Sequence, residues 1–164
     1  MKTPVARRLM LSALLCAAVY AIGSHHGTAA VTDQRREVEQ TFDRYVQGWN
    51  QGSVEILADI YAHDAKIIAY WPDPSNPSVQ GWDAIKKSLE DVFTRIHGMA
   101  LDFKERQVEV YGDVALLTST WTWKEAEAPM FEHGRASFMF QRRNHKWVVV
   151  HEHSSIQPFL PKAE

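Results

Sequence analysis

The chain has 164 residues, a formal net charge of −2 at pH 7 and a single cysteine. This length is typical of one domain, and the sequence contains no internal repeat or low-complexity run. The charge balance supplies no basic stripe to neutralise phosphates, so a nucleic-acid partner is not expected. Because one cysteine cannot form an intramolecular disulfide, stability must come from a hydrophobic core.

The N-terminal segment has the order of a secretory signal peptide. Three basic residues among the first eight precede an uncharged apolar run from Leu9 to Ile22. The run is shorter than the roughly 20 residues that a membrane-spanning helix needs. We therefore predict a signal peptide over residues 1–23, cleaved near residue 23 or 30, and an exported domain over residues 31–160, periplasmic or extracellular. An uncleaved membrane anchor is the alternative. Cleavage would remove the three positive charges and change the net charge of the chain from −2 to −5.

Helices are predicted first along the mature chain. From Thr32 to Asn50, apolar residues recur at the spacing of one amphipathic helix: Val38, Phe42, Tyr45, Val46 and Trp49. Gln51-Gly52-Ser53 ends this helix and caps a shorter one. A further apolar stripe from Ile85 to Ile96 predicts another helix, which ends at Gly98.

Strands dominate the rest of the chain. Residues 65–71 have strand character, followed by longer segments at 101–111, 114–124, 131–143 and 146–156. Turn residues at Gly112-Asp113 and Asn144-His145 predict two hairpins. Helices followed by antiparallel strands indicate an α+β domain in which the helices cover one face of the sheet.

Three segments resemble a SnoaL-like domain of the nuclear-transport-factor-2-like superfamily: WNQGSVEILADIYAHDAKI, QGWDAIKKSLEDVF and GRASFMFQRRNHKWVVVHEHSS. The resemblance covers roughly Asp33 to Pro158. Its ending, from Trp147 to Ser155, also resembles the association domain of calcium/calmodulin-dependent kinases. The resemblance implies a cone-shaped fold with three N-terminal helices packed on a curved antiparallel sheet around a cavity. Relatives isomerise, cyclise, dehydrate, bind ligands or assemble, so the fold alone does not decide the function.

The segment DRYVQGWNQG resembles the steroid isomerases and places Tyr45 where their oxyanion tyrosine lies. The positions of their two acids fall on Ala69 and on or near Ala136. Without those acids, steroid-type isomerisation is not expected. Tyr45 is then either a core residue with its hydroxyl at the cavity edge or a polar anchor of the site.

Two histidines stand near the end of the last predicted strand. Strict alternation places Trp147, Val149, His151 and His153 on one face, and the register from the hairpin turn puts Phe138 opposite His151. We therefore expect both imidazoles to face the cavity. There each could act as a general base, a hydrogen-bond donor or a metal ligand, or serve only a structural role.

A metal site would need further ligands, for which the candidates are His63, Asp64 and His133. The sequence pattern does not determine toward which side these three side chains point. We expect neither a metal nor another cofactor.

Most of the aromatic residues are expected in the core. Some would also line the cavity and contact a flat or apolar ligand. The predicted lining comprises Trp49, Tyr61, Trp71, Trp121, Trp123, Phe138 and Ser155.

The opposite face of the sheet is expected to carry Met139, Val148 and Val150. Exposed apolar residues on a sheet imply a covering partner, so we predict a homodimer through this outer face. Arg135 shares the face, where the register places it opposite Glu152 or Ser154.

Two functions of different classes follow from these patterns. The first is an exported domain that binds a small, partly apolar molecule, with Tyr45, His151 and His153 as polar anchors. The second is a small lyase, isomerase or hydrolase in which one of the two histidines is the general base. A third possibility, a homo-oligomeric assembly module, fits the kinase-association resemblance.

Overall fold

A computed structural model describes residues 31–64, 66–71, 78–96, 98–124 and 131–157. The chain divides into two units, residues 1–34 and 35–164. Of the first unit, residues 31–34 are described and are helical, whereas the predicted signal peptide lies outside the described residues. Within the described ranges, no helix is long and apolar enough to cross a membrane. The account below concerns the second unit.

The predicted amphipathic helix is present, with helical residues described over 31–51. Its buried stripe consists of Val38, Phe42, Tyr45 and Trp49. Gly52, with a φ of 61°, ends this long helix, because a left-handed backbone is easiest for glycine. Ser53 then caps α2 (Val54–Ala58), its hydroxyl accepting from the backbone N–H of Ile56 at 3.2 Å.

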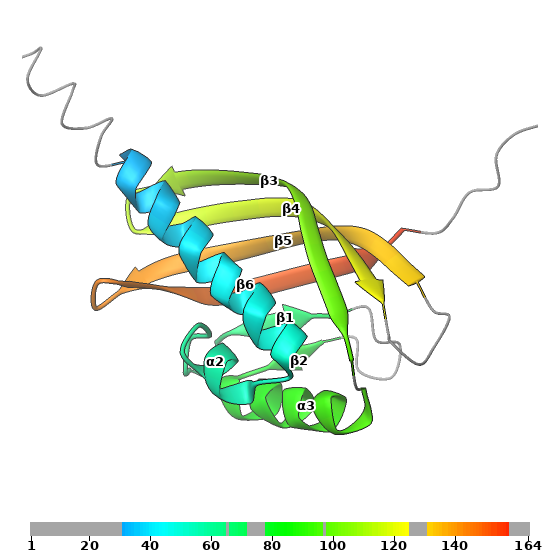
Figure 1. Cartoon of the computed structure of the whole chain (residues 1–164). Helices are drawn as coiled ribbons and strands as arrows, with labels where there is room; N and C mark the ends of the chain where they lie inside the picture. Colours follow the sequence, from blue (N-terminus) through cyan, green and yellow to red (C-terminus); the bar gives the residue numbers. More distant parts are fainter. Residues whose placement is uncertain (1–30, 65, 72–77, 97, 125–130, 158–164) are drawn as a thin grey trace, which may run out of the picture. The chain divides into compact units, whose positions relative to one another are not determined.

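The strands form one six-stranded sheet in the order β2-β1-β6-β5-β4-β3 (Figure 1). The two short strands are β1 (Ile68–Tyr70) and β2 (Val79–Gln80), and α3 (Trp82–Arg95) follows them. The long strands are β3 (Ala100–Tyr111), β4 (Val114–Lys124), β5 (Phe131–Arg143) and β6 (Lys146–Ile156). Their bounds lie within one residue of the predicted ones.

The sheet is mixed rather than antiparallel, which corrects the prediction. β1 runs parallel to β6, with Ala69 beside Glu152, whereas all other strand pairs are antiparallel. Side-chain alternation indicates which face a residue occupies, but it does not encode the direction of a neighbouring strand. The side-chain pattern therefore could not show that β1 runs parallel to β6.

The two predicted hairpin turns are confirmed. Gly112 has a φ of 63°, and Asn144 and His145 have φ values of 48° and 63°. In the second turn, positive φ at both central residues is the geometry of a type I′ turn, whose twist matches that of the flanking strands. As predicted, Arg143 pairs with Lys146 directly across the second turn.

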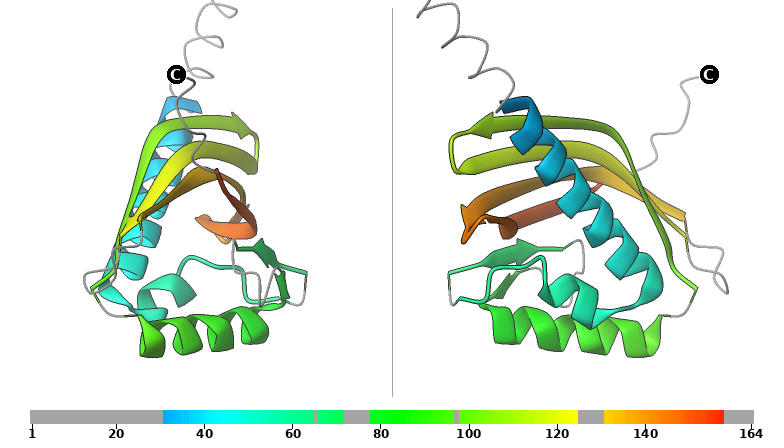
Figure 2. Two further views of the ribbon diagram at one scale, coloured as in Figure 1. Left: turned by 90° about the vertical axis from the view of Figure 1, so that its right-hand side faces the viewer. Right: turned by 60° about the vertical axis from the view of Figure 1, so that its left-hand side comes forward.

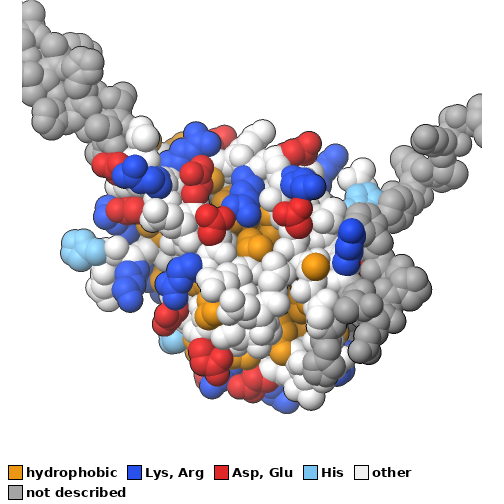
Figure 3. Space-filling view, viewed as in Figure 1, with side chains coloured by type: hydrophobic (Ala, Val, Ile, Leu, Met, Phe, Trp, Pro, Cys, Tyr) orange, Lys and Arg blue, Asp and Glu red, His pale blue; other side chains and the backbone are white. Residues whose placement is uncertain are grey.

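The core lies between the long helix and the inner face of the sheet (Figure 2). The ring of Phe42 from the helix packs edge-on against Phe103 and Phe138, with centroids 5.0 and 4.9 Å apart. On the exposed side of the helix, Arg44 pairs with Asp59 at 3.0 Å. Positive and negative side chains are interspersed over the face shown in Figure 3, so the charge there is balanced locally.

Candidate functional site

A β-bulge in β6 decides which side chains enter the interior. Phe140 pairs with Val149, but the next pair joins Met139 to His151, so Val150 is an extra residue. A bulge of this kind shifts the alternation of a strand by one position. Beyond it Glu152 is buried opposite Phe138, and His153 is exposed. The prediction that both imidazoles face the interior is therefore wrong.

The carboxyl of Glu152 is enclosed by three uncharged donors. It is 1% exposed. Tyr45 Oη donates to its Oε1 at 2.8 Å, Trp71 Nε1 donates to the same oxygen at 2.9 Å, and Tyr61 Oη donates to Oε2. No Lys or Arg among the described residues forms an ion pair with it. We call Tyr45, Tyr61, Trp71 and Glu152 the Glu152 cluster.

Three elements converge on β6 to build this cluster. Tyr45 comes from the buried stripe of the long helix, and Trp71 directly follows β1. Tyr61 follows α2 and is held by backbone bonds on both sides: Val149 N donates to Ile60 O at 2.8 Å, and Ala62 N donates to Val149 O at 2.9 Å. The short segment after α2 thus pairs with β6 just before the bulge.

Burial and hydrogen bonding act in opposite directions on the acid. Burial raises the pKa of Glu152, and the hydrogen bonds from Tyr61, Tyr45 and Trp71 lower it by less, so the net shift is upward. Burial also raises the pKa of Tyr45 and of Tyr61, and the nearby Glu152 charge raises both further. Both phenols therefore keep their protons and remain donors across the ordinary pH range.

A group of tryptophans borders the cluster. Trp49 packs edge-on against Trp71 with centroids 5.9 Å apart, and Trp123 lies 6.4 Å from Trp49. The buried indole N–H groups of Trp49 and Trp123 have no hydrogen-bond acceptor among the residues described. The indole of Trp49 nevertheless has a weak hydrogen-bond interaction with the Tyr61 hydroxyl, which acts to lower the pKa of Tyr61. The indole N–H of Trp123 is therefore a buried donor next to this aromatic group that has no acceptor among the described residues.

The remaining predicted lining residues divide between the two faces. Phe138 is buried, with its ring 5.0 Å from that of Tyr45. Trp121 is also buried, but its indole N–H already donates to the Arg135 carbonyl at 3.2 Å. Ser155 is exposed and pairs with Arg135 on the outer face, so its predicted place in the interior is wrong.

His151 and His153 lie on the outer side of β6 around Tyr70, with ring centroids 5.8 and 6.1 Å from the phenol ring. Burial lowers the pKa of His151, and the nearby His153 lowers it further. The two imidazoles form an aromatic patch that is separated from the Glu152 carboxyl by the strand itself.

The candidate metal ligands have other partners. His63 stacks on Trp82 with centroids 4.4 Å apart, and Asp64 pairs with Arg143 at 2.6 Å. The hydrogen bond from Arg143 is the main reason that the pKa of Asp64 is lowered. Across the described ranges, no three His, Cys, Asp or Glu side chains are grouped closely enough to hold a metal ion.

Sequence reasoning missed Glu152, which it placed on the outer face, with Arg135 opposite either Glu152 or Ser154. The structure places Arg135 opposite Ser155 instead. One signal was available: Glu152 is the only acid in the segment 146–156. It also lies beside Ala69 in the β1–β6 ladder, so the neighbouring strand supplies a carboxyl next to the position where an acid was sought.

Comparisons with known proteins agree with this fold. A family model described as a SnoaL-like domain matches residues 38–159. A nuclear-transport-factor-2-like protein of unknown function from Pseudomonas putida has a TM-score of 0.71 at 22% identity, covering 80% of this chain and 91% of its own. A proposed scytalone dehydratase from Novosphingobium aromaticivorans has a TM-score of 0.68 at 18% identity, covering 80% and 89%.

A proposed calcium/calmodulin-dependent protein kinase II association domain from Xanthomonas campestris has a TM-score of 0.64 at 23% identity, covering 76% of this chain and 89% of its own. No curated protein matches the sequence. The family match and the similar solved structures confirm the fold resemblance inferred from the sequence.

Proposed function

The chain belongs to the SnoaL-like domain family, and we propose that it binds a small, partly apolar molecule between the long helix and the sheet, beside the Glu152 cluster. The molecule carries a hydrogen-bond acceptor such as a carbonyl oxygen. Aromatic rings contact its apolar part, and the indole N–H of Trp123 donates to its acceptor.

The observation that carries this proposal is the buried indole N–H of Trp123, which lacks an acceptor among the described residues. Leaving a buried donor unpaired costs free energy, so such groups normally have a partner in the working protein. A ligand oxygen placed beside Trp123 would accept from its indole N–H. Tyr45, Tyr61 and Trp71 do not compete for that oxygen, because they already donate to Glu152.

A matched pair of probes tests the proposal. Acetophenone and ethylbenzene have similar size and shape, but only acetophenone carries an acceptor oxygen. We expect the domain to bind acetophenone more tightly in ligand-observed NMR titrations. The Trp123→Phe variant keeps a ring and removes the N–H group, so it should reduce this preference by about threefold to tenfold, the usual value of one hydrogen bond.

Trp147→Phe is the matched control. Its indole N–H donates to Glu37 at 3.1 Å, so the same chemical change is made outside the tryptophan group. We expect it to leave the preference for acetophenone unchanged. Equal binding of acetophenone and ethylbenzene by the unaltered domain would contradict the proposal. An equal loss of the preference for acetophenone in Trp123→Phe and Trp147→Phe would also contradict it.

A second candidate function is proton transfer by Glu152, as in a lyase or isomerase. It is favoured by a buried carboxyl whose pKa is raised, because a proton-transfer group works best with a pKa near the operating pH. In the simplest step, a carboxylate removes a proton from the carbon next to a carbonyl, and the electron pair moves onto the carbonyl oxygen. Exchange of the acetophenone methyl protons with deuterated water would report this step. We expect the exchange to be lost in Glu152→Gln, and exchange no faster than in buffer would exclude this candidate.

We propose a second copy of the chain as the partner of the outer sheet face near the hairpin turns. Val114, Leu116 and Met139 are 37, 38 and 43% exposed there. The half-buried Val148 and Val150 adjoin them on β6. Together these five residues form the apolar outer patch, which a like patch would cover.

We propose export as well, supported by the basic and apolar order of the N-terminal segment. N-terminal sequencing of the protein recovered from the periplasm or medium should give a first residue near Ser24 or Val31. Recovery only inside the cell, with Met1 intact, would exclude export with cleavage.

A further inference from the structure

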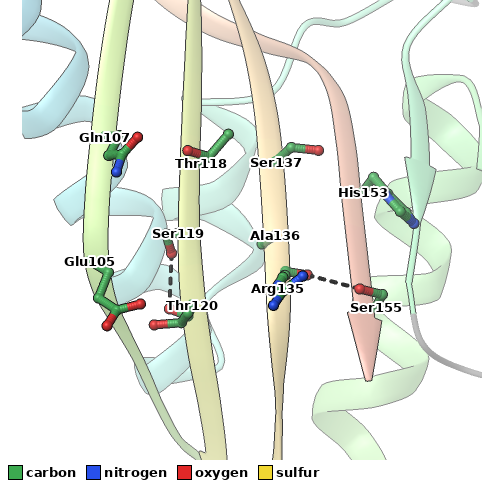
Figure 4. Close-up of a pocket in the computed structure, with 10 residues that line it drawn as sticks. All are labelled: Glu105, Gln107, Thr118, Ser119, Thr120, Arg135, Ala136, Ser137, His153 and Ser155. Atoms are coloured by element: carbon green, nitrogen blue, oxygen red, sulfur yellow. Dashed lines mark hydrogen bonds between the residues drawn. The ribbon is translucent and has the colours of Figure 1, made fainter. Parts of the chain in front are cut away.

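The outer face of the long strands also has a polar part, which lies beyond the apolar outer patch and away from the hairpin turns. It forms a hollow of about 390 Å³ lined by side chains from β3, β4, β5 and β6 (Figure 4). We call this hollow the polar groove. Its exposed side chains, among them Arg135 and His153, lie on the opposite side of the sheet from the Glu152 cluster, because Phe138 and Glu152 on the same strands are buried. The buried residues Ser119 and Ala136 also line the hollow.

Strand pairing aligns the first row of the polar groove. Gln107 pairs with Thr118, Thr118 with Ser137, and Ser137 with His153. Adjacent members of the row are therefore direct cross-strand neighbours, separated by about 5 Å. The row offers an amide, two hydroxyls and an imidazole, all of which form hydrogen bonds without carrying a fixed charge.

The second row carries the charges. Thr120 pairs with Arg135, and Arg135 pairs with Ser155. At the β3 end of the groove stands Glu105, whose φ of 53° belongs to the irregularity in that strand. The Thr120 hydroxyl on β4 thus lies between the Glu105 carboxylate on β3 and Arg135 on β5, and the Ser155 hydroxyl lies beyond Arg135 on β6.

Within the described part of the chain, neither Arg135 nor Glu105 of the polar groove forms an ion pair. The backbone carbonyl of Arg135 accepts from Trp121 and Ser155, but its exposed guanidinium has no ion-pair or hydrogen-bond partner among the described residues. Glu105 has no ion-pair partner within the same ranges either. The two groups stand on strands separated by one intervening strand, which places them about 10 Å apart.

We infer that the polar groove binds a small polyhydroxylated organic acid of the sugar-acid type, with its carboxylate at Arg135 and its hydroxyls along the two rows. A guanidinium binds a carboxylate through paired, charge-assisted hydrogen bonds. Serine, threonine and glutamine side chains match hydroxyl groups, and Glu105 accepts from the far hydroxyl. An extended acid of six carbons has the length needed to reach from Arg135 to Glu105.

Other ligand classes fit less well. A neutral sugar would leave the guanidinium without a counter-charge, and a bare anion would leave most of the hydroxyls unused. An apolar ligand would take hydroxyls away from water without replacing their hydrogen bonds. The competing occupant is the second copy of the chain, if the dimer extends from the apolar outer patch over the polar groove.

Three probes separate these cases: gluconate, which has both the carboxylate and the hydroxyls, glucose, which lacks the carboxylate, and acetate, which lacks the hydroxyls. We expect amide NMR titrations of the mature protein to show gluconate binding most tightly of the three. The largest shifts should fall on the groove strands around Thr118 and Ser137. Arg135→Gln should weaken gluconate binding about tenfold or more, because it removes the charge-assisted contact.

Arg44→Gln is the matched control, since it removes one guanidinium from the long helix, where Arg44 pairs with Asp59. It should leave gluconate binding unchanged. Equal weakening of gluconate binding by Arg135→Gln and Arg44→Gln would overturn the inference. Amide chemical-shift changes that fall away from the polar groove would overturn it as well. Gluconate binding by the Val148→Glu variant but not by the unaltered protein would also overturn the inference. The second copy of the chain would then be the natural occupant of the polar groove. These outcomes do not depend on the interior ligand, whose test uses different probes and variants.

Discussion

The phenol oxygen of Tyr45 lies 2.8 Å from Oε1 of Glu152, a residue 107 positions further along the chain. This bond joins the long helix to the last strand through a carboxyl that has almost no contact with solvent. Because its partners are all uncharged, both the proton affinity of Glu152 and the stability of the fold depend on the same few hydrogen bonds.

Glu152→Gln should change how stability depends on pH. The pKa of Glu152 is raised in the folded protein, so the folded state holds this proton more tightly than the unfolded state does. Its favourable contribution is present below the unfolded pKa and is lost as the pH rises through the folded pKa. A folded-state pKa that lies one pH unit above the unfolded pKa corresponds to about 1.4 kcal/mol in the free energy of unfolding.

The measurement is urea unfolding of both proteins at several values between about pH 4 and about pH 8, the range that covers ordinary and raised carboxyl pKa values. The unaltered domain should lose stability relative to Glu152→Gln as the pH rises. Parallel curves for the two proteins would show that Glu152 keeps an ordinary pKa.

Tyr45→Phe and Tyr61→Phe should each destabilise the fold by about 1 to 3 kcal/mol at neutral pH, because each removes one donor from a buried acid and keeps the ring. Urea unfolding measures this loss. Tyr111→Phe is the control: Tyr111 is 65% exposed and its hydroxyl donates to the carboxylate of Glu109, so the change should stay within about 0.5 kcal/mol. A loss no larger in the two buried variants than in the control would mean that the cluster does not stabilise the fold.

Gly134→Ala should be far more damaging than a glycine replacement at a turn. A Cβ at Gly134 would lie 1.8 Å from the backbone oxygen of Ser155, so β5 and β6 would have to separate there. We expect a loss of about 3 kcal/mol or more, or failure to fold. A Cβ at Gly112 would have no atom within 4 Å apart from its chain neighbours, so only the positive φ opposes alanine, at a cost of about 1 to 2 kcal/mol. Circular dichroism and urea unfolding compare the two, and equal losses would contradict the close approach of β5 and β6.

Val148→Glu should dissociate the proposed homodimer, because it places an unpaired charge in the apolar outer patch. Light scattering of the mature protein should give the mass of two chains before the change and of one chain after it. Ser78→Glu adds the same charge at an exposed position outside the patch and should leave the mass unchanged. An unaltered domain with the mass of one chain would exclude the dimer.

The sequence predicted the long strands well, because their alternation and turn residues are local signals. Residues 114–124, 131–143 and 146–156 were placed with the bounds that the structure has. The site was predicted less well. Tyr45, Trp49, Tyr61 and Trp71 do lie around one interior region, but the acid that they surround was expected on the other face.

That error has a definite physical origin. The run from Val148 to Val150 is uniformly apolar, so its composition does not reveal that one of its residues is extra. The bulge is fixed by pairing with β5 and by the backbone bonds around Tyr61, which are tertiary contacts. Strict alternation across such a run predicts the wrong face for every residue that follows.

The extra residue in β6 also affects how relatives should be aligned with this chain. A relative whose last strand is regular has one residue fewer before its interior position, so a correct alignment contains a gap opposite Val150. Without the gap, the interior side chain of that relative would be matched to His151 instead of Glu152. Homologous site residues in this family are therefore better assigned by superposing inward-facing positions than by counting along the strand.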